Sequence, residues 1–286
     1  MTQQAMMQAI GKKAETDYRI LFLGDIVGRA ARNAVGAQLA EIKSHYTIDA
    51  AIVNCENAAG GFGVTPDICD RLFEAGCDVL TTGNHVFDKG EISPYIGRET
   101  RLIRPLNMGA EYPGAGYVII QCAGGMRLAV VNVMCNLFMA ENANAFAAAD
   151  KIKASMILGR DIDAMVVDFH GEATSEKMAM GFYFDGHASL VVGTHTHIPT
   201  ADCRVLDGGT AYQTDAGMCG DYNSVIGMDK QAATSRFTGE SGGRLSVASG
   251  PPSLCGVLVD VELSTGLAKQ ACSFRRGGAL ENTSAV

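Results

Sequence analysis

Carboxylate, amide and imidazole side chains follow five short apolar segments of this sequence. They are Asp25, Glu56, Asn57, Asn84, His85, His170, His195 and His197. Each segment is typical of a buried β-strand, and in open α/β sheets ligands collect at the carboxyl ends of the strands. Nitrogen and oxygen donors gathered at such an edge can hold divalent transition metals. The sequence therefore predicts a site for a pair of metal ions.

The spacing of His195 and His197 supports this interpretation. They alternate across Thr196, so in an extended segment both imidazoles would point to one side. A single histidine on an apolar strand is usually a core residue, but this set is too large for that explanation. Glu56 is the carboxylate placed to bridge two cations ~3.5–4 Å apart. Its neighbour Cys55 is expected to face the core.

The donor set also bears on the metal and the substrate. Taken alone, Asn57 or Asn84 could be an ordinary turn residue. As neutral oxygen donors among imidazoles and carboxylates they keep the negative charge of the site low, which favours an anionic phosphate substrate. Nitrogen and oxygen donors without thiolate suit iron, manganese, zinc or nickel rather than calcium, and the sequence does not select among them.

Short apolar strands recur along the chain, and helical patterns lie between the first of them. Strands are predicted over residues 18–23, 50–53, 78–81, 164–167 and 189–192, with helices over residues 30–44 and 65–75. Thr65 and Pro66 are expected to begin the second helix as N-cap and first helical residue. This order predicts parallel βαβ units and an α/β fold.

Later segments suggest antiparallel pairs. Residues 116–122 and 126–133 flank Ala123-Gly124-Gly125, and residues 202–206 and 210–213 flank Asp207-Gly208-Gly209, so each pair predicts a hairpin. A further strand is expected over 254–263, a helical insertion over 136–159, and a loop or lid over 238–252.

Composition limits the class of protein. The formal charge of −8 argues against an extended nucleic-acid partner, which requires a basic face. The 9 cysteines form no C-x-x-C pair and are expected to be free thiols in a reducing cytoplasm. No secretory signal and no apolar run long enough to span a membrane is predicted.

Several motifs together resemble the bacterial YmdB-like branch of the calcineurin-like metallophosphoesterases. They are Leu23-Gly24-Asp25-Ile26-Val27-Gly28, Asn54-Cys55-Glu56-Asn57, Thr82-Gly83-Asn84-His85-Val86-Phe87-Asp88, His170-Gly171-Glu172-Ala173-Thr174-Ser175-Glu176-Lys177, Gly193-Thr194-His195-Thr196-His197 and Thr214-Asp215-Ala216-Gly217-Met218. The broader superfamily opens with D-x-H and uses a bridging aspartate. Here Val27 and Glu56 stand instead, as in the YmdB-like branch.

The resemblance implies a four-layer α/β/β/α sandwich with two mixed sheets. The resemblance also implies two metal ions per chain, with iron favoured and manganese or zinc as alternatives, and a homo-oligomer. Length and apolar composition allow one large domain or two smaller ones, and we predict one. This metallophosphoesterase domain is expected over residues 18–275, with the helical insertion near 136–159, between an N-terminal extension over 1–17 and a tail over 276–286.

Residue roles follow from the same resemblance. One metal would be held by Asp25, Glu56, Asn57 and His197, and the other by Glu56, Asn84, His170 and His195. A hydroxide bridging the metals would attack phosphorus, and His85 would protonate the leaving oxygen. The implied substrates are small phosphodiesters, in particular 2′,3′- and 3′,5′-cyclic nucleotides.

Two other functions remain compatible with these residues. A phosphomonoesterase, such as a nucleotidase or phosphoprotein phosphatase, could use the same metals and acid. A regulatory nucleotide-binding protein with weak activity is the other, although such a protein has no need of His85. Arg29 and Arg32 could contact phosphate or only solvent. Residues 174–177 could cap a helix or contact substrate through Thr174, Ser175 or Lys177.

Overall fold

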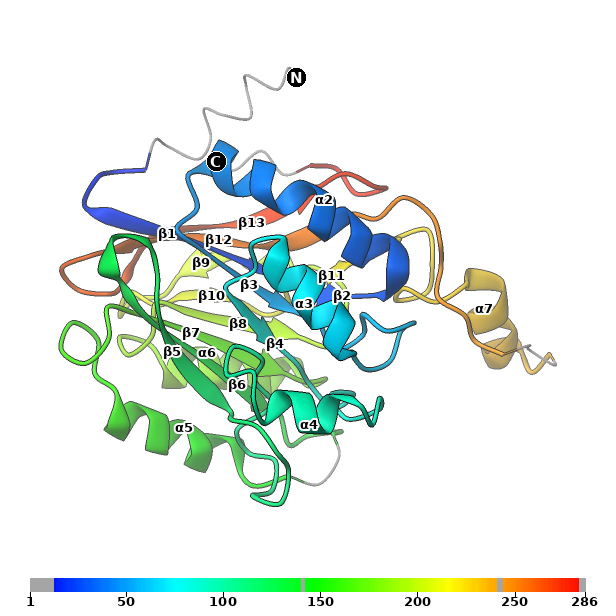
Figure 1. Ribbon diagram of the computed structural model, residues 1–286, viewed down its shortest axis with the longest axis horizontal. Helices are drawn as coiled ribbons and strands as arrows, with labels where there is room; N and C mark the ends of the chain where they lie inside the picture. Colours follow the sequence, from blue (N-terminus) through cyan, green and yellow to red (C-terminus); the bar gives the residue numbers. More distant parts are fainter. Residues whose placement is uncertain (1–12, 140–141, 241–243, 283–286) are drawn as a thin grey trace.

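The computed structural model describes residues 13–139, 142–240 and 244–282 (Figure 1). Its first sheet has the strand order β13–β12–β1–β3–β4. These strands are β13 (Ala268–Arg276), β12 (Leu254–Glu262), β1 (Asp17–Leu23), β3 (Ala50–Asn54) and β4 (Val79–Thr81). The pairs β1–β3 and β3–β4 are parallel, as predicted, whereas β12 is antiparallel to β1 and β13. Strand β13 was not predicted from the sequence.

The second sheet has the strand order β5–β6–β7–β8–β10–β9. Its strands are β5 (Tyr117–Gln121), β6 (Arg127–Met134), β7 (Ala164–His170), β8 (Leu190–Thr194), β10 (Ala211–Gln213) and β9 (Arg204–Val205). The predicted hairpins are present as the antiparallel pairs β5–β6 and β9–β10. The central pairs β6–β7, β7–β8 and β8–β10 are parallel, so both sheets are mixed.

Helices cover the outer face of each sheet. They are α2 (Gly28–Tyr46), α3 (Pro66–Glu74), α4 (Ile92–Ile96), α5 (Ala145–Ser155) and α6 (Thr174–Tyr183). Two others lie apart from these faces: α7 (Lys230–Thr238) and the short 3₁₀ helix η1 (Ala123–Gly125), which lies between β5 and β6. One apolar core lies between the first sheet and α2 and α3, and another between the second sheet and α5 and α6. A third core joins the facing sides of the sheets. The fold is the expected four-layer α/β/β/α sandwich.

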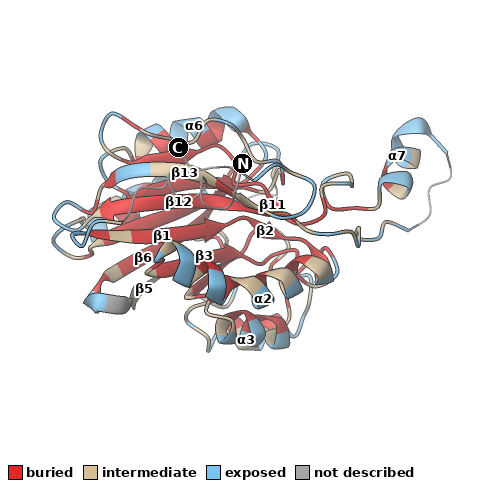
Figure 2. Cartoon of the chain, turned by 90° about the horizontal axis from the view of Figure 1, so that it is seen from above, coloured by how far each residue is buried: buried red, intermediate tan, exposed pale blue. Residues whose placement is uncertain are grey.

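The buried strands explain why the sequence gives continuous apolar runs there rather than alternation. All five residues of β3 and all seven of β7 are buried, because each sheet is covered on both faces (Figure 2). Cys55 is fully buried in the core beneath α2 and α3, as predicted. The helix α3 begins as expected, with Thr65 at the N-cap and Pro66 at N1, although the Thr65 side chain makes no capping bond.

Three features differ from the sequence predictions. A small parallel ribbon of β2 (Asp25–Ile26) and β11 (Met218–Cys219) was not predicted. In the expected helical insertion, the described helix α5 occupies only Ala145–Ser155. Helix α7 precedes the expected loop at 238–252 and projects from the body of the molecule (Figure 1).

Part of that loop, and residues 1–12 of the expected N-terminal extension, lie outside the described residues. None of the described helices is long and apolar enough to cross a membrane.

Candidate metal centre

Four side chains from different strand ends meet at the Nε2 atom of His170. This atom lies 3.1 Å from Asn84 Oδ1, 3.2 Å from Glu56 Oε1 and 3.2 Å from His195 Nδ1. His170 is the last residue of β7, and the other three residues follow β4, β3 and β8 within three positions. The topology of the two sheets therefore brings these distant parts of the chain to one point.

A buried hydrogen-bond network fixes the ring of His170. The Thr194 hydroxyl donates to Asp168 Oδ1 at 2.6 Å and lies 2.8 Å from His170 Nδ1. Since the hydroxyl proton is committed to the carboxylate, Thr194 Oγ1 accepts from Nδ1–H. The lone pair of His170 then lies on Nε2 and points at Glu56, Asn84 and His195. Such outer hydrogen bonds are how proteins orient metal-binding histidines.

This cluster consists of acceptor atoms that require a positive charge among them. Glu56 and His170 are fully buried, so no bulk water separates their lone pairs. Burial acts to lower the pKa of His170, but the charge and hydrogen bond of Glu56 outweigh it and raise that pKa to about 9. Burial and the nearby charge of His170 lower the pKa of His195 to about 3. A proton can supply the missing charge, and a metal cation fits the same donor set.

A second group of donors adjoins the first through Glu56. The Asn57 amide lies 3.1 Å from both Glu56 Oε1 and His197 Nε2. His197 Nδ1 donates to the Ile226 carbonyl at 2.8 Å, which leaves its Nε2 as the acceptor facing the site. The oxygen and nitrogen of an amide exchange places by a half turn, so Asn57 can present its oxygen here.

Asp25 completes this second group. One carboxylate oxygen, Oδ2, accepts from the backbone N–H of His195 at 3.2 Å. The other, Oδ1, is buried and has no hydrogen-bond partner. Burial raises the pKa of Asp25 to about 6, although His197 and His170 act to lower it. A buried carboxylate oxygen without a donor fits a cation held at this position.

His85 stands at the edge of the cluster rather than within it. Its backbone N–H donates to Glu56 Oε2 at 3.2 Å, and its ring Nδ1 lies 2.8 Å from Asp88 Oδ2. Phe62 contacts the ring edge-on, with centroids 5.0 Å apart. Since Asp88 engages Nδ1, the Nε2 atom is the nitrogen left for a substrate.

The two histidines after β8 reach the site by a route that the sequence did not predict. His195 and His197 lie in a turn with φ of 95° and 68°, so the prediction of an extended segment was wrong. Residues other than glycine adopt such conformations only where the surroundings hold them. Here Asp215 Oδ2 accepts from both the backbone N–H (3.2 Å) and the hydroxyl (2.7 Å) of Thr196.

Lys177 supports this turn instead of contacting a substrate. It is 1% exposed and donates to Asp215 Oδ2 and to the Thr194 carbonyl, both at 2.7 Å. Thr174 and Ser175 are exposed at the start of α6, and no side chain caps that helix, so the capping prediction was wrong.

A cavity of about 340 Å³ opens over the cluster. One wall carries Glu56, Asn57, His85, Glu172 and residues 195–197. Another wall is apolar and consists of Phe62, Ile226, Met228 and Leu245. The cavity can therefore hold a small polar group at the cluster and a flat apolar group beside it.

All eight residues singled out from the sequence lie at this site. Sequence reasoning did not single out Phe62, Asp88 or Asp215. Asp88 and Asp215 both stand within motifs that carry the family resemblance, Thr82–Asp88 and Thr214–Met218, but neither residue was given a role. Phe62 gave no signal beyond following a pair of glycines.

A two-sheet sandwich with this cluster at its strand ends defines the metallophosphatase class of folds. The chain belongs to the family described as YmdB-like protein, whose model matches residues 21–273. It is an enzyme of the phosphoesterase class.

Relatives and solved structures agree with this assignment. A 2′,3′-cyclic-nucleotide 2′-phosphodiesterase from Bacillus subtilis is 42% identical over 258 residues, covering 90% of this chain and 96% of the relative. The crystal structure of a novel phosphatase from Mycoplasma pneumoniae superposes with a TM-score of 0.84 at 33% identity, covering 91% of this chain and 94% of that one. A hypothetical protein from Thermus thermophilus gives a TM-score of 0.82 at 36% identity, covering 91% and 100%.

Proposed function

We propose that this enzyme is a two-metal phosphodiesterase that hydrolyses small phosphodiesters, with cyclic nucleotides as the substrate class. The observation that carries the proposal is the meeting of four acceptor atoms at His170 Nε2, next to the unpartnered Asp25 Oδ1. One metal would be held by Asp25, Glu56, Asn57 and His197, and the other by Glu56, Asn84, His170 and His195. Iron is the favoured metal, with manganese or zinc as alternatives.

The bound ions would lower the pKa of water and neutralise charge on the phosphate oxygens. His85 would donate a proton to the leaving oxygen from Nε2, while the Asp88 carboxylate holds the ring through Nδ1. Phe62 would offer its exposed face to the base of a nucleotide.

The charges of the cavity favour a diester over a monoester. Glu56 and Glu172 lie in its wall, and among the described residues that line it there is no lysine or arginine. A monoester carries a second negative charge at neutral pH, which this wall leaves without a protein cation. A phosphodiester has only one charge for the metals to neutralise.

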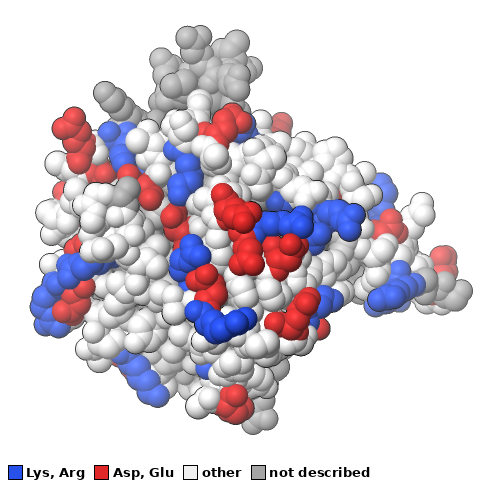
Figure 3. Space-filling view, in the orientation of Figure 1, with Lys and Arg blue, Asp and Glu red and all other residues white. Residues whose placement is uncertain are grey.

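The cavity and the molecular surface both favour a small substrate. The cavity suits a mononucleotide, and Figure 3 shows acidic and basic side chains interspersed on the face drawn, without a basic stripe. Extended nucleic acid is therefore not the proposed partner.

We also propose an oligomeric state, a cellular compartment and a domain organisation for the enzyme. A homo-oligomer is supported by helix α7, which projects from the body and exposes 87% of Phe237 (Figure 2). The nine free cysteines support a reducing cytoplasm. Residues 18–275 are proposed as one domain because the core between the sheets joins both halves of the chain.

The substrate class is tested with the metal-loaded enzyme on four substrates: 2′,3′-cyclic AMP, 3′,5′-cyclic AMP, 2′-AMP and 3′-AMP. We expect the cyclic diesters to be cleaved at least about tenfold faster than the monoesters, because the extra charge costs binding. Chromatography of the products identifies which ester bond breaks. Faster cleavage of the monoesters would instead establish a phosphomonoesterase.

A further inference from the structure

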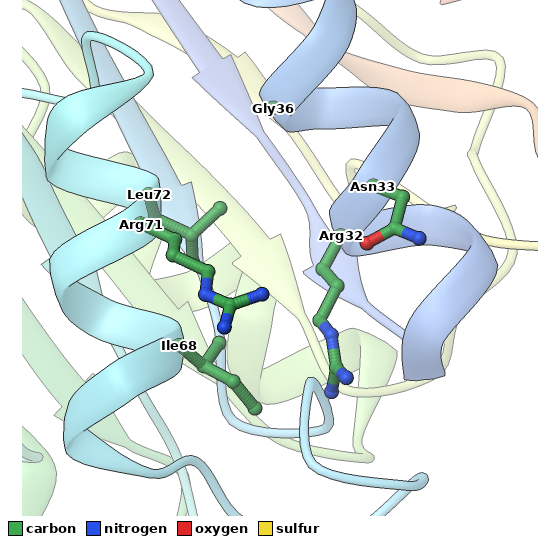
Figure 4. A pocket seen from close by; sticks show the side chains of 6 residues that line it. All are labelled: Arg32, Asn33, Gly36, Ile68, Arg71 and Leu72. Atoms are coloured by element: carbon green, nitrogen blue, oxygen red, sulfur yellow. The ribbon is translucent and has the colours of Figure 1, made fainter.

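A second cavity lies between helices α2 and α3, separate from the candidate metal centre. Its volume is about 210 Å³, and it is lined by Arg32, Asn33, Gly36, Ile68, Arg71 and Leu72. Figure 4 shows the guanidinium groups of Arg32 and Arg71 reaching from the two helices into the space between them. No residue lines both this cavity and the one over the metal cluster.

Positive charge exceeds negative charge around this cavity. Arg71 pairs with Asp67 at 3.1 Å, one turn earlier on α3. Arg32 donates to the neutral carbonyl of Ala58 at 2.9 Å. Burial lowers the pKa of Arg32, and the like charges of Arg29 and Arg71 lower it further. Two arginines thus face one small space in a protein whose net charge is −8.

The shape of the cavity complements this charge. Ile68 and Leu72 supply apolar wall from α3, and Arg32 beside them is half-buried, whereas the Arg71 side chain is 72% exposed. Asn33 lines the cavity from the side of α2 with a neutral amide. Guanidinium groups bind phosphate oxygens through paired, charge-assisted hydrogen bonds.

We propose that the cavity between α2 and α3 is a binding site for a phosphate oxyanion, either inorganic phosphate or the phosphate of a small monoester. Arg32 and Arg71 bind the anion from opposite helices. None of the proposed metal ligands lines this cavity, and the proposal stands independently of the reaction at the metal cluster.

Arg32 connects the site to the loop that carries two predicted metal ligands. Its guanidinium donates a hydrogen bond to the carbonyl of Ala58, the residue after Asn57. The backbone N–H of Gly28 donates to the Asn57 carbonyl at 3.0 Å. An anion bound by Arg32 therefore acts on the group that anchors this loop.

The proposal is tested by equilibrium dialysis of radiolabelled inorganic phosphate against the metal-loaded enzyme. The variants are Arg71→Gln, Asp67→Asn and, as a matched control, Arg98→Gln, which changes an exposed arginine outside the cavity. We expect Arg71→Gln to weaken one class of phosphate sites about tenfold, since it removes one charge-assisted contact. Asp67→Asn should tighten the same class, because it frees Arg71 from its carboxylate.

The wild type and the three variants share the same metal cluster and therefore the same phosphate binding there. Differences in phosphate binding among these four proteins thus report on the α2–α3 cavity. The control should bind phosphate as the wild type does. A competition experiment with 3′-AMP then separates the two sources of the anion. If 3′-AMP displaces phosphate from the class of sites that Arg71→Gln weakens, the cavity also accepts monoesters. If it displaces none, the cavity is a site for free inorganic phosphate. Identical phosphate binding by the wild type, Arg71→Gln and Asp67→Asn would overturn the proposal.

Discussion

Gly83 shows how closely the backbone approaches the metal cluster. A Cβ atom at this position would lie 2.2 Å from His170 Nε2 and 2.3 Å from Glu56 Oε2. Those two atoms belong to the proposed ligands, so any side chain here would enter the space between them. The residue before Asn84 must therefore be glycine for steric reasons.

The variant Gly83→Ala should lose most of its bound metal, because the methyl group displaces His170 or Glu56. Elemental analysis after purification measures the loss. Gly90→Ala is the matched control, since no atom lies within 4 Å of a Cβ at Gly90. Normal metal content in Gly83→Ala would show that these atoms do not hold the metal.

The role of His85 predicts an effect that depends on the leaving group. His85→Ala should reduce the turnover of a cyclic nucleotide by about 10²–10⁴, the usual contribution of a general acid. For bis(p-nitrophenyl) phosphate, whose leaving group needs little protonation, the reduction should be much smaller. Metal content should be unchanged.

Steady-state kinetics of both substrates with wild type and variant measure the two reductions. Equal losses with both substrates would assign His85 to positioning rather than to proton donation. For each protein, the two substrates differ in how much their leaving group needs a proton, so the difference between the two reductions reports on proton donation by His85.

Among the structural elements of the site, the turn after β8 is the one with strained backbone conformations. His195 and His197 adopt positive φ, and Asp215 holds Thr196 between them. Lys177 on α6 neutralises Asp215 in a buried pair, at 2.7 Å. Helix α6 thereby stabilises a turn that would otherwise relax.

Lys177→Met should lower the free energy of unfolding by about 3–5 kcal/mol, because it leaves Asp215 buried without its cation. Urea denaturation at fixed metal load measures the change. Lys230→Met, which alters an exposed lysine bonded to Asn223, should change it by no more than about 0.5 kcal/mol. A loss below about 1 kcal/mol in Lys177→Met would mean that the pair contributes little to holding the turn.

Sequence patterns predicted the strands and turns that depend on neighbouring residues in the sequence. The strands preceding Asp25, Glu56 and His170 are continuous apolar runs, and the glycines between β5 and β6 specify a hairpin. The β2–β11 ribbon and β13 were not predicted, because long-range pairing decides short or partly exposed strands. The turn at His195 and His197 was also missed, since Asp215 and Lys177 impose it from elsewhere in the chain.

For the whole molecule, the sandwich explains why residues far apart in sequence form one cluster. The two sheets pack face to face, and the carboxyl ends of β1, β3, β4, β7 and β8 deliver the proposed ligands. The residues of the cluster could be singled out from the sequence because each follows a recognisable strand. Phe62, which contacts His85, could not, because it lies in a loop whose path depends on tertiary packing.

The most direct test of the account combines elemental analysis of the purified enzyme with hydrolysis of bis- and mono-p-nitrophenyl phosphate. The account predicts about two metal ions per chain and faster cleavage of the bis-ester. One metal ion or none, with no cleavage after reloading with iron or manganese, would contradict it.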